Sequence, residues 1–235
     1  MSKTILVTGG AGGICSDICR GMAADGLNVV VADFAKEAAD KVAAEINASK
    51  GSAIAVQVDV GDPASVAAMM QQAVAKYGQV DYVFCGAGVM DRVAIIDMPE
   101  AMWDRLMRIN LKGVFLCAQA AAKHMMPRSE GRILSIASGR GVAGQARSAH
   151  YAASKAGVIA FTKSLAMELA PNNITVNCVC PGATDTPMSR IGFTDDQFKK
   201  REEIPPLMDG LTHKFEIVGL VRYLLSDAAK YITGQ

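Results

Sequence analysis

The stretch "HYAASKAG", His150 to Gly157, places a tyrosine and a lysine four residues apart in an otherwise small, helix-forming run. At i and i+4 on a helix, Tyr151 and Lys155 project from the same face and reach one small site. A phenol titrates near ~10, so it needs a nearby cation to transfer protons at neutral pH. With Lys155 as that cation, Tyr151 is predicted to exchange a proton with a carbonyl or alcohol oxygen. The alternative is a half-buried aromatic beside a solvated lysine.

A glycine-rich turn, "TGGAGGIC", follows the first apolar run and precedes a helical pattern. Glycines there let the backbone approach a pyrophosphate and place it at the N-terminus of a helix. The strict G-x-G-x-x-G spacing is absent, because Cys15 stands where the last glycine would fall. Asp33 ends the second apolar run, where dinucleotide sites bind a ribose hydroxyl. Its alternative role is to cap the next helix.

Short apolar, β-branched runs alternate with helical patterns along the chain, which indicates crossover units of a parallel sheet. The predicted strands are 4–9, 27–33, 53–60, 80–86, 132–138 and 174–182, and the longer helical patterns are 35–49, 63–78, 99–125 and 148–170. We expect one α/β domain over residues 1–235: a Rossmann-like, doubly wound parallel sheet with helices on both faces. Residues 182–213 break the alternation and predict a substrate-binding lid.

Bulk composition limits the classes of partner. The chain has 235 residues, 51% of them hydrophobic, and a formal net charge of +1. The Lys and Arg residues are scattered along the sequence and form no basic cluster that would bind nucleic acid or an anionic membrane. A small-molecule substrate is therefore expected. Without a long apolar run or a signal-peptide pattern, we expect a cytoplasmic protein. Its six cysteines then read as reduced core residues, and no metal site is expected.

Taken together, several motifs resemble the short-chain dehydrogenase/reductase family along essentially the whole chain. They are Thr8-Gly9-x-x-x-Gly13, Asp59-Val60, Asn110, Ser138, Tyr151-x-x-x-Lys155 and Pro181-Gly182. The resemblance implies that Ser138 hydrogen-bonds the substrate oxygen, that Asn110 bends its helix and holds a water in a proton relay, and that Lys155 also binds the nicotinamide ribose. Ser135 competes with Ser138, but it falls within a predicted strand and its spacing does not match.

The expected catalytic set is therefore Asn110, Ser138, Tyr151 and Lys155. The turn, the acid and the resemblance together predict the cofactor-binding set: Gly9, Gly12, Gly13, Ile14, Asp33, Phe34, Asp59, Val60, Gly86, Ala87, Tyr151, Lys155, Pro181, Gly182, Thr184 and Thr186.

Three features depart from the family pattern. Cys15 replaces the third glycine of the turn, so the first helix is expected to sit slightly further from the sheet. "CGAG", Cys85 to Gly88, stands where the family usually has Asn-Asn-Ala-Gly, so Gly86 offers only its backbone. The printed sequence stops at "YITGQ", where the family has one more edge strand; we expect either a shortened sequence or a chain without that strand.

The leading hypothesis is an oxidoreductase that moves a hydride between a nicotinamide cofactor and a secondary alcohol or ketone. Asp33 favours NAD, because its charge would repel a 2′-phosphate. Lys36 is the one nearby cation in sequence and is expected to point outward. The alternative is a cofactor sensor or scaffold without chemistry, and an epimerase would need a larger lobe than the chain allows.

Apolar residues expected near the substrate favour an apolar, aryl or cyclic compound, although they equally suit simple packing. They are Val89, Met90, Met188, Ile191, Phe193, Leu207, Met208 and Leu211. Arg92, Arg140 and Arg147 flank the same region and are candidates for holding a carboxylate, or for solvated surface charges. The family resemblance and the apolar faces of the two long helices predict a homo-oligomer, by family a tetramer.

Overall fold

The computed structural model describes residues 2–191, 194–204 and 211–235. Its parallel sheet has six strands in the order β3-β2-β1-β4-β5-β6. The strands are β1 (Thr4–Thr8), β2 (Asn28–Asp33), β3 (Ser52–Gln57), β4 (Tyr82–Cys85), β5 (Gly131–Ile136) and β6 (Ile174–Val179). All six predicted strands are confirmed, although β3 ends at Gln57 rather than at Val60. The predicted Rossmann-like α/β fold is confirmed.

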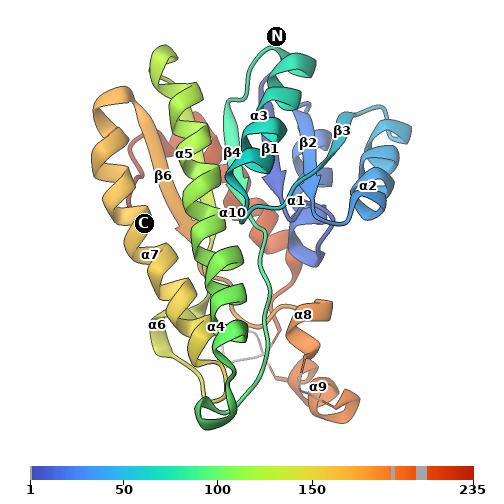
Figure 1. Ribbon diagram of the computed structural model, residues 1–235. Coiled ribbons are helices and arrows are strands. Elements are labelled where there is room, and N and C mark those ends of the chain that lie inside the picture. The colour runs from blue at the N-terminus through green and yellow to red at the C-terminus, as the bar shows by residue number, and fades with distance from the viewer. Residues whose placement is uncertain (1, 192–193, 205–210) are drawn as a thin grey trace.

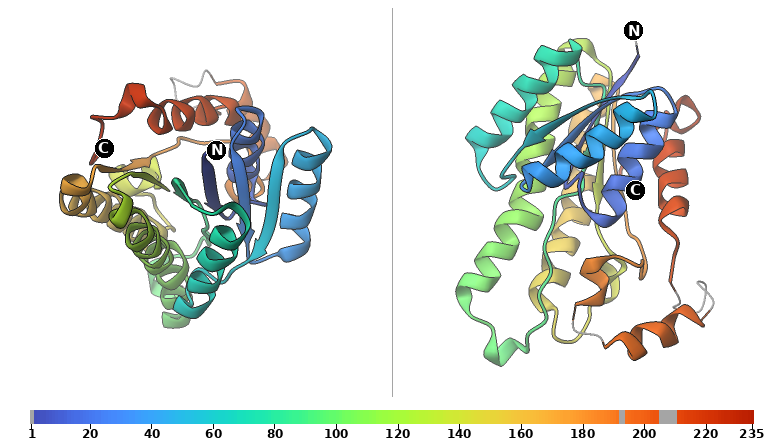
Figure 2. Two further views of the ribbon diagram at one scale, coloured as in Figure 1. Left: turned by 90° about the horizontal axis from the view of Figure 1, so that it is seen from above. Right: turned by 90° about the vertical axis from the view of Figure 1, so that its right-hand side faces the viewer.

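Helices cover both faces of the sheet (Figures 1 and 2). Leu6 of β1 points into one apolar core and its neighbours Ile5 and Val7 into the other, as the alternation of a strand requires. The first core is closed by α3 (Pro63–Tyr77), α5 (Gly113–Met125) and α7 (Ala149–Leu169). The second is closed by α1 (Gly13–Ala24), α2 (Lys36–Ala48) and α10 (Lys214–Leu225).

The helical pattern predicted over 99–125 forms a rod with an irregular middle. It runs from α4 (Glu100–Met107) through a π-helical turn, η2 (Arg108–Lys112), into α5. A π-turn inserts an extra residue into a helix and is common at functional sites. Asn110 lies in this turn, so the bend implied for it by family resemblance coincides with an observed irregularity.

Short helical segments fill the connections. They are η1 (Ile95–Asp97), η3 (Met126–Arg128), α6 (Gly139–Ala143), η4 (Ala170–Asn172), α8 (Pro187–Arg190), α9 (Asp195–Glu202) and η6 (Asp227–Ala229). The sequence patterns did not predict α6, which is one of the shortest. The excursion 182–213 contains α8 and α9, which lie beyond the carboxyl ends of the strands (Figure 1).

The two ends of this excursion meet. Thr184 forms a parallel bridge with Thr212, and the Thr212 amide donates to the carbonyl oxygen of Ala183 at 2.7 Å. At the other side of the fold, residues 232–235 run along the outer edge of β6. The Gly234 amide donates to Val176 O at 2.8 Å, and Cys178 N donates to Gln235 O at 2.7 Å. Part of the outer edge of β6 is therefore paired.

Candidate active site

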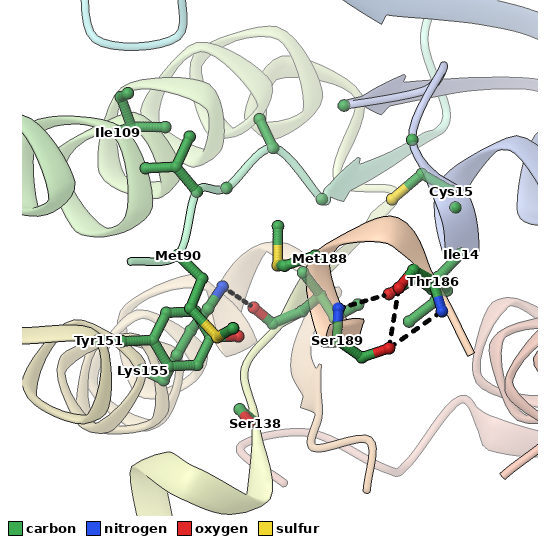
Figure 3. A pocket seen from close by; sticks show the side chains of 18 of the residues that line it. Ile14, Cys15, Met90, Ile109, Ser138, Tyr151, Lys155, Thr186, Met188 and Ser189 are labelled. Atoms are coloured by element: carbon green, nitrogen blue, oxygen red, sulfur yellow. Dashed lines mark hydrogen bonds between the residues drawn. The ribbon is translucent and has the colours of Figure 1, made fainter. Parts of the chain in front are cut away.

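A cavity of about 1070 Å³ opens at the carboxyl ends of the strands, between the glycine turn, the loops after β4, β5 and β6, the start of α7, and α8 (Figure 3). The order in which successive strands are added to the sheet reverses between β1 and β4, and such switch points bind ligands in open α/β sheets. Every residue predicted for the cofactor lines this cavity, and so do Ser138, Tyr151 and Lys155. Asn110 is fully buried behind its wall.

The glycine turn has the geometry of an anion cradle. Gly9 has a φ of +68°, and a Cβ there would lie 2.8 Å from the Cα of Ala87. A Cβ on Gly13 would lie 2.7 Å from Cγ2 of Thr186. Helix α1 begins at Gly13, and its N-cap, Gly12, has no side chain to satisfy the first amides. Backbone amides at a helix N-terminus suit a pyrophosphate, so these residues fit a dinucleotide.

Asp33 is held by backbone amides at the mouth of the cavity. Its Oδ2 accepts a hydrogen bond from Ala11 N, and its Oδ1 accepts one from Ala35 N, both at 3.0 Å. The N-cap of α2 is Ala35, so Asp33 is not the cap that the alternative reading required. Lys36 forms an ion pair with Asp40 along the helix surface, as its predicted outward direction requires. Asp33 therefore presents a fixed negative charge to the cavity.

The second predicted acid, Asp59, is bound by a basic residue that sequence patterns did not single out. Arg108 places Nη1 at 3.0 Å from Oδ1 and Nη2 at 2.7 Å from Oδ2 of Asp59. Oδ1 also accepts from the Gly61 amide at 2.9 Å. A forked guanidinium–carboxylate pair is strong and directional. It ties the loop after β3 to the π-turn, a contact between distant segments that no local pattern signals.

Tyr151 and Lys155 both face the cavity from α7 and are 8% and 3% exposed. Lys155 donates through Nζ to the carbonyl oxygen of Ile136 at 2.9 Å and lies 5.7 Å from the centre of the Tyr151 ring. Burial lowers the pKa of Lys155 to about 8, although the neighbouring Cys15 and Cys180 thiols have the opposite, raising effect on it. Burial also raises the pKa of Tyr151 above its usual range. The predicted i, i+4 juxtaposition is present.

Ser138 caps α6 and faces the tyrosine. Its Oγ accepts a hydrogen bond from Arg140 N at 3.2 Å, which fixes the hydroxyl at the start of the helix. Hydrogen bonding to Ser138 counteracts the effect of burial on the Tyr151 pKa. Ser135, the competing candidate, is buried within β5 at 2% exposure. Ser138 is thus the serine of the two that lines the cavity.

Asn110 braces the loop that follows β4. Its Oδ1 accepts from Val89 N and its Nδ2 donates to Val89 O, both at 2.8 Å. Gly88 lies between this amide and the lysine: a Cβ on Gly88 would sit 3.3 Å from Asn110 Oδ1 and 3.6 Å from Lys155 Nζ. Glycine at position 88 therefore leaves open the space between Asn110 and Lys155, where the predicted proton relay would run.

An apolar cluster covers the tyrosine on the substrate side. Met90 and Leu106 are buried with Tyr151, and Val89 and Met188 pack against them. Val89, Met90 and Met188 line the cavity as expected, whereas Ile191 and Leu211 do not. The other residues expected in this group, Phe193, Leu207 and Met208, lie outside the described residues. Of the three candidate arginines, Arg140 lines the cavity, while Arg92 and Arg147 do not.

The two departures at Cys15 and Gly86 are complementary. A Cβ on Gly86 would lie 2.3 Å from the Cys15 sulfur, 2.8 Å from Thr8 O and 3.0 Å from a ring atom of Phe84. The thiol thus occupies the space that a side chain at position 86 would need. Burial raises the pKa of Cys15 to about 12, so this sulfur is a packing atom rather than a nucleophile.

Within the parts of the chain that the structure describes, no group of three or more His, Cys, Asp or Glu side chains is arranged to hold a metal ion. In the same residues, no helix combines the length and the apolar character that a membrane crossing requires.

Comparison with known proteins places this geometry in context. The model of the short chain dehydrogenase family matches residues 3–196. The 3-oxoacyl-[acyl-carrier-protein] reductase FabG of Staphylococcus aureus is 39% identical over 100% of this chain and 95% of its own length. The 3-oxoacyl-[acyl-carrier-protein] reductase of Synechocystis is 38% identical over 100% of this chain and 94% of its own.

Solved structures agree with the fold. A short-chain type dehydrogenase/reductase from Mycobacterium marinum superposes with a TM-score of 0.91, at 35% identity, covering 99% of this chain and 91% of that one. A variant of the actinorhodin polyketide ketoreductase, solved with NADPH, superposes with a TM-score of 0.93, at 32% identity, covering 100% of this chain and 94% of that one.

The contact between Cys15 and Gly86 generates a stability prediction. Gly86→Ala should destabilise the fold by roughly 1–3 kcal/mol, because the added methyl overpacks against the sulfur. Cys15→Gly/Gly86→Ala should recover part of that loss, with a coupling of about 0.5–3 kcal/mol measured by denaturant unfolding of the double-mutant cycle.

Gly219→Ala in α10 is the matched control, since a Cβ there meets no atom within 4 Å and glycine disfavours helices. It should leave stability unchanged or raise it. If the destabilisations caused by Cys15→Gly and Gly86→Ala simply added in the double variant, the Cys15 sulfur and a side chain at position 86 would not compete for the same space.

Proposed function

The chain belongs to the short-chain dehydrogenase/reductase family, and on that premise we propose that it interconverts a secondary alcohol and a ketone with a nicotinamide cofactor. The observation that carries this proposal is that Ser138, Tyr151 and Lys155 line the same cavity as the glycine turn. The cofactor, when bound, supplies or accepts the hydride. The chain's own residues then have to bind the substrate oxygen and move one proton.

In this proposal the substrate carbonyl oxygen lies between the hydroxyls of Ser138 and Tyr151. Ser138 Oγ is kept in place by the Arg140 amide and donates a hydrogen bond to the oxygen as negative charge develops on it. Tyr151 Oη delivers the proton in ketone reduction and removes it in alcohol oxidation. Lys155, buried beside the ring, favours the phenolate and would also hold the ribose of the cofactor.

The alternative is a protein that binds the cofactor without chemistry. It does not require a serine hydroxyl and a tyrosine hydroxyl to face the same cavity, nor the cost of burying a lysine to 3% exposure beside them. The arrangement therefore favours an enzyme over a sensor or scaffold.

For the substrate, the proposal is a ketone or alcohol with an apolar substituent, which would pack on Val89, Met90 and Met188 at the wall of the cavity. We expected aryl or cyclic compounds; the relatives named above, as 3-oxoacyl-[acyl-carrier-protein] reductases, favour a 3-oxoacyl group as a second candidate. The excursion 182–213 would act as the lid, since Thr186 lies on the glycine turn and Met188 on the cluster.

Tyr151→Phe should abolish turnover while leaving cofactor binding nearly unchanged, because it removes only the phenolic hydroxyl. Ser138→Ala should lose roughly 10²–10³ in turnover, as expected for one oxyanion donor. Cofactor absorbance is followed with a panel of aryl, cyclic, carboxylated and 3-oxoacyl-thioester substrates. Near-normal rates for the phenylalanine variant would contradict the mechanism, and cofactor binding without turnover of any substrate would favour the sensor.

For the cofactor, we propose NAD rather than NADP. The Asp33 carboxylate can accept hydrogen bonds from both ribose hydroxyls, whereas a 2′-phosphate would bring two negative charges together. Ala11, Phe34, Ala35 and Ala38, which line the cavity around Asp33, are uncharged. Lys36 is paired with Asp40. A related ketoreductase was solved with NADPH, which makes NADP the competing candidate.

The ratio of catalytic efficiencies with NAD and NADP should favour NAD in the wild type and collapse in Asp33→Ala. Asp40→Ala is the control: it releases Lys36 but leaves the acid that faces the ribose, so NAD preference should persist. Preference of the wild type for NADP, or a ratio that Asp33→Ala leaves unchanged, would mean that this carboxylate does not distinguish a ribose hydroxyl from a 2′-phosphate.

We also propose a homo-oligomer, expected as a tetramer from the family. An apolar groove between the α4–α5 rod and α7 is lined by Met107, Leu111, Phe115 and Phe161. The rings of Phe115 and Phe161 meet edge to face, 6.3 Å apart, and Phe115 is 40% exposed. Because α5 and α7 lie side by side on one face, a second copy would bury the groove on both chains (Figure 1).

Light scattering at micromolar concentration should give the mass of more than one chain. Phe161→Asp should reduce it, because the carboxylate would lie in the buried interface. Tyr231→Asp, at an exposed site after α10, should leave the mass unchanged. A wild-type mass of a single chain would overturn the proposal.

A further inference from the structure

Arg140 is a half-buried cation beside the tyrosine for which the family resemblance assigns no role. Its Cζ lies 6.0 Å from the centre of the Tyr151 ring, close to the 5.7 Å of Lys155 Nζ. Its Nη1 contacts the sulfur of Met90, the buried residue that packs on the same ring. The guanidinium therefore lies at the wall of the cavity where the proton moves.

The backbone fixes this position. Arg140 N donates to Ser138 Oγ at 3.2 Å, and the next residue, Gly141, packs directly on α7. A Cβ on Gly141 would lie 2.7 Å from the carbonyl carbon of Lys155 and 2.8 Å from Ala156 N. Helix α6 thus touches α7 backbone to backbone at the lysine, which sets the base of the Arg140 side chain relative to Tyr151.

Lys155 alone is a limited source of positive charge. Burial brings its pKa to about 8, so its ammonium progressively loses its proton above that pH. A guanidinium keeps its charge throughout the working range. Burial raises the pKa of Tyr151, and the Arg140 charge acts in the opposite direction together with the Ser138 hydrogen bond.

Other charged groups lie on the elements around Tyr151. Asp91, in the loop after β4, is paired with Arg105 of α4 at 3.1 Å, and Arg108 is paired with Asp59. His150, next to the tyrosine on α7, has its pKa lowered by burial, which disfavours its positively charged form. Among the residues that the structure describes, Lys155 and Arg140 are the cations found within about 6 Å of the ring centre.

We propose that Arg140 is a positioning residue whose guanidinium stabilises the Tyr151 phenolate during proton transfer, as a second cation beside Lys155. This inference rests on the proposed function of the site. Alcohol oxidation requires the phenolate, so its rate rises with pH through the titration of Tyr151; without Arg140 that rise moves to higher pH. Ketone reduction requires the neutral phenol, so its activity extends to higher pH in the same variant.

Arg140→Met should lower alcohol oxidation at neutral pH on the order of tenfold and displace the pH–rate curve to higher pH. Arg140→Lys should restore much of the rate and the curve up to the pH at which the new ammonium loses its proton. Arg147→Met is the matched control, because Arg147 is an exposed arginine between α6 and α7 that does not line the cavity; its curve should match the wild type.

A spectroscopic titration gives a readout that does not need turnover. The chain has five tyrosines, so the tyrosinate absorbance of Tyr151 is isolated as the difference between each protein and its Tyr151→Phe counterpart. The midpoint should rise in Arg140→Met and stay at the wild-type value in Arg147→Met. Thermal unfolding of each variant checks that the fold is retained, and Arg140→Lys supplies the comparison if the methionine variant is unstable.

Unchanged pH curves and an unchanged Tyr151 midpoint in Arg140→Met would overturn the inference while leaving the proposed function intact. A raised KM for carboxylated substrates alone, with the midpoint unmoved, would also overturn it and show that Arg140 binds substrate. Absence of turnover in the wild type with every substrate would instead count against the proposed function, and the absorbance titration would still decide the role of Arg140.

Discussion

Burial of one ammonium group, Lys155, governs the architecture of the site. A buried charge is costly unless polar groups compensate it, and here the Ile136 carbonyl at the end of β5 accepts its hydrogen bond at 2.9 Å. The lysine can reach that carbonyl only if α7 lies close to the carboxyl end of β5. Two glycines permit this approach: Gly88 leaves space beside Nζ, and Gly141 lets α6 touch the backbone at Lys155.

The same edge collects the remaining groups because all the strands are parallel. Thr8, Cys85 and Ser135 lie at one level across β1, β4 and β5, so the loops after these strands converge. At the switch point the backbones approach so closely that Gly9 meets Ala87. Cys15 is larger than the glycine of the family pattern, and Gly86 is smaller than the asparagine. The two changes compensate in volume and keep this region filled, which explains how the chain departs from the pattern at both positions and keeps the fold.

Electrostatics divide the cavity into two regions. At one end, backbone amides and the start of α1 offer positive partial charge of the kind that binds phosphates, while Asp33 places a negative charge at the mouth of the cavity. At the opposite end, Lys155 and Arg140 flank a tyrosine buried among methionines. Low dielectric there strengthens the effect of each charge on the phenol.

The sequence by itself determined the alternation of strands and helices, the glycine turn, Asp33 at a strand end, and the Tyr151–Lys155 pair, because these depend on periodicity, turn chemistry and helical spacing. Only the tertiary structure decided that Arg108 binds Asp59, that Cys15 fills the space beside Gly86, that α6 caps at Ser138, and that Arg140 rather than Arg92 or Arg147 reaches the cavity. These contacts join residues that no regular spacing in the sequence relates to one another. The direction of a side chain in a loop is also set by the surfaces that pack against that loop. A local pattern can place a residue on a strand or a helix, whereas its partner across the sheet edge exists only once the chain has folded.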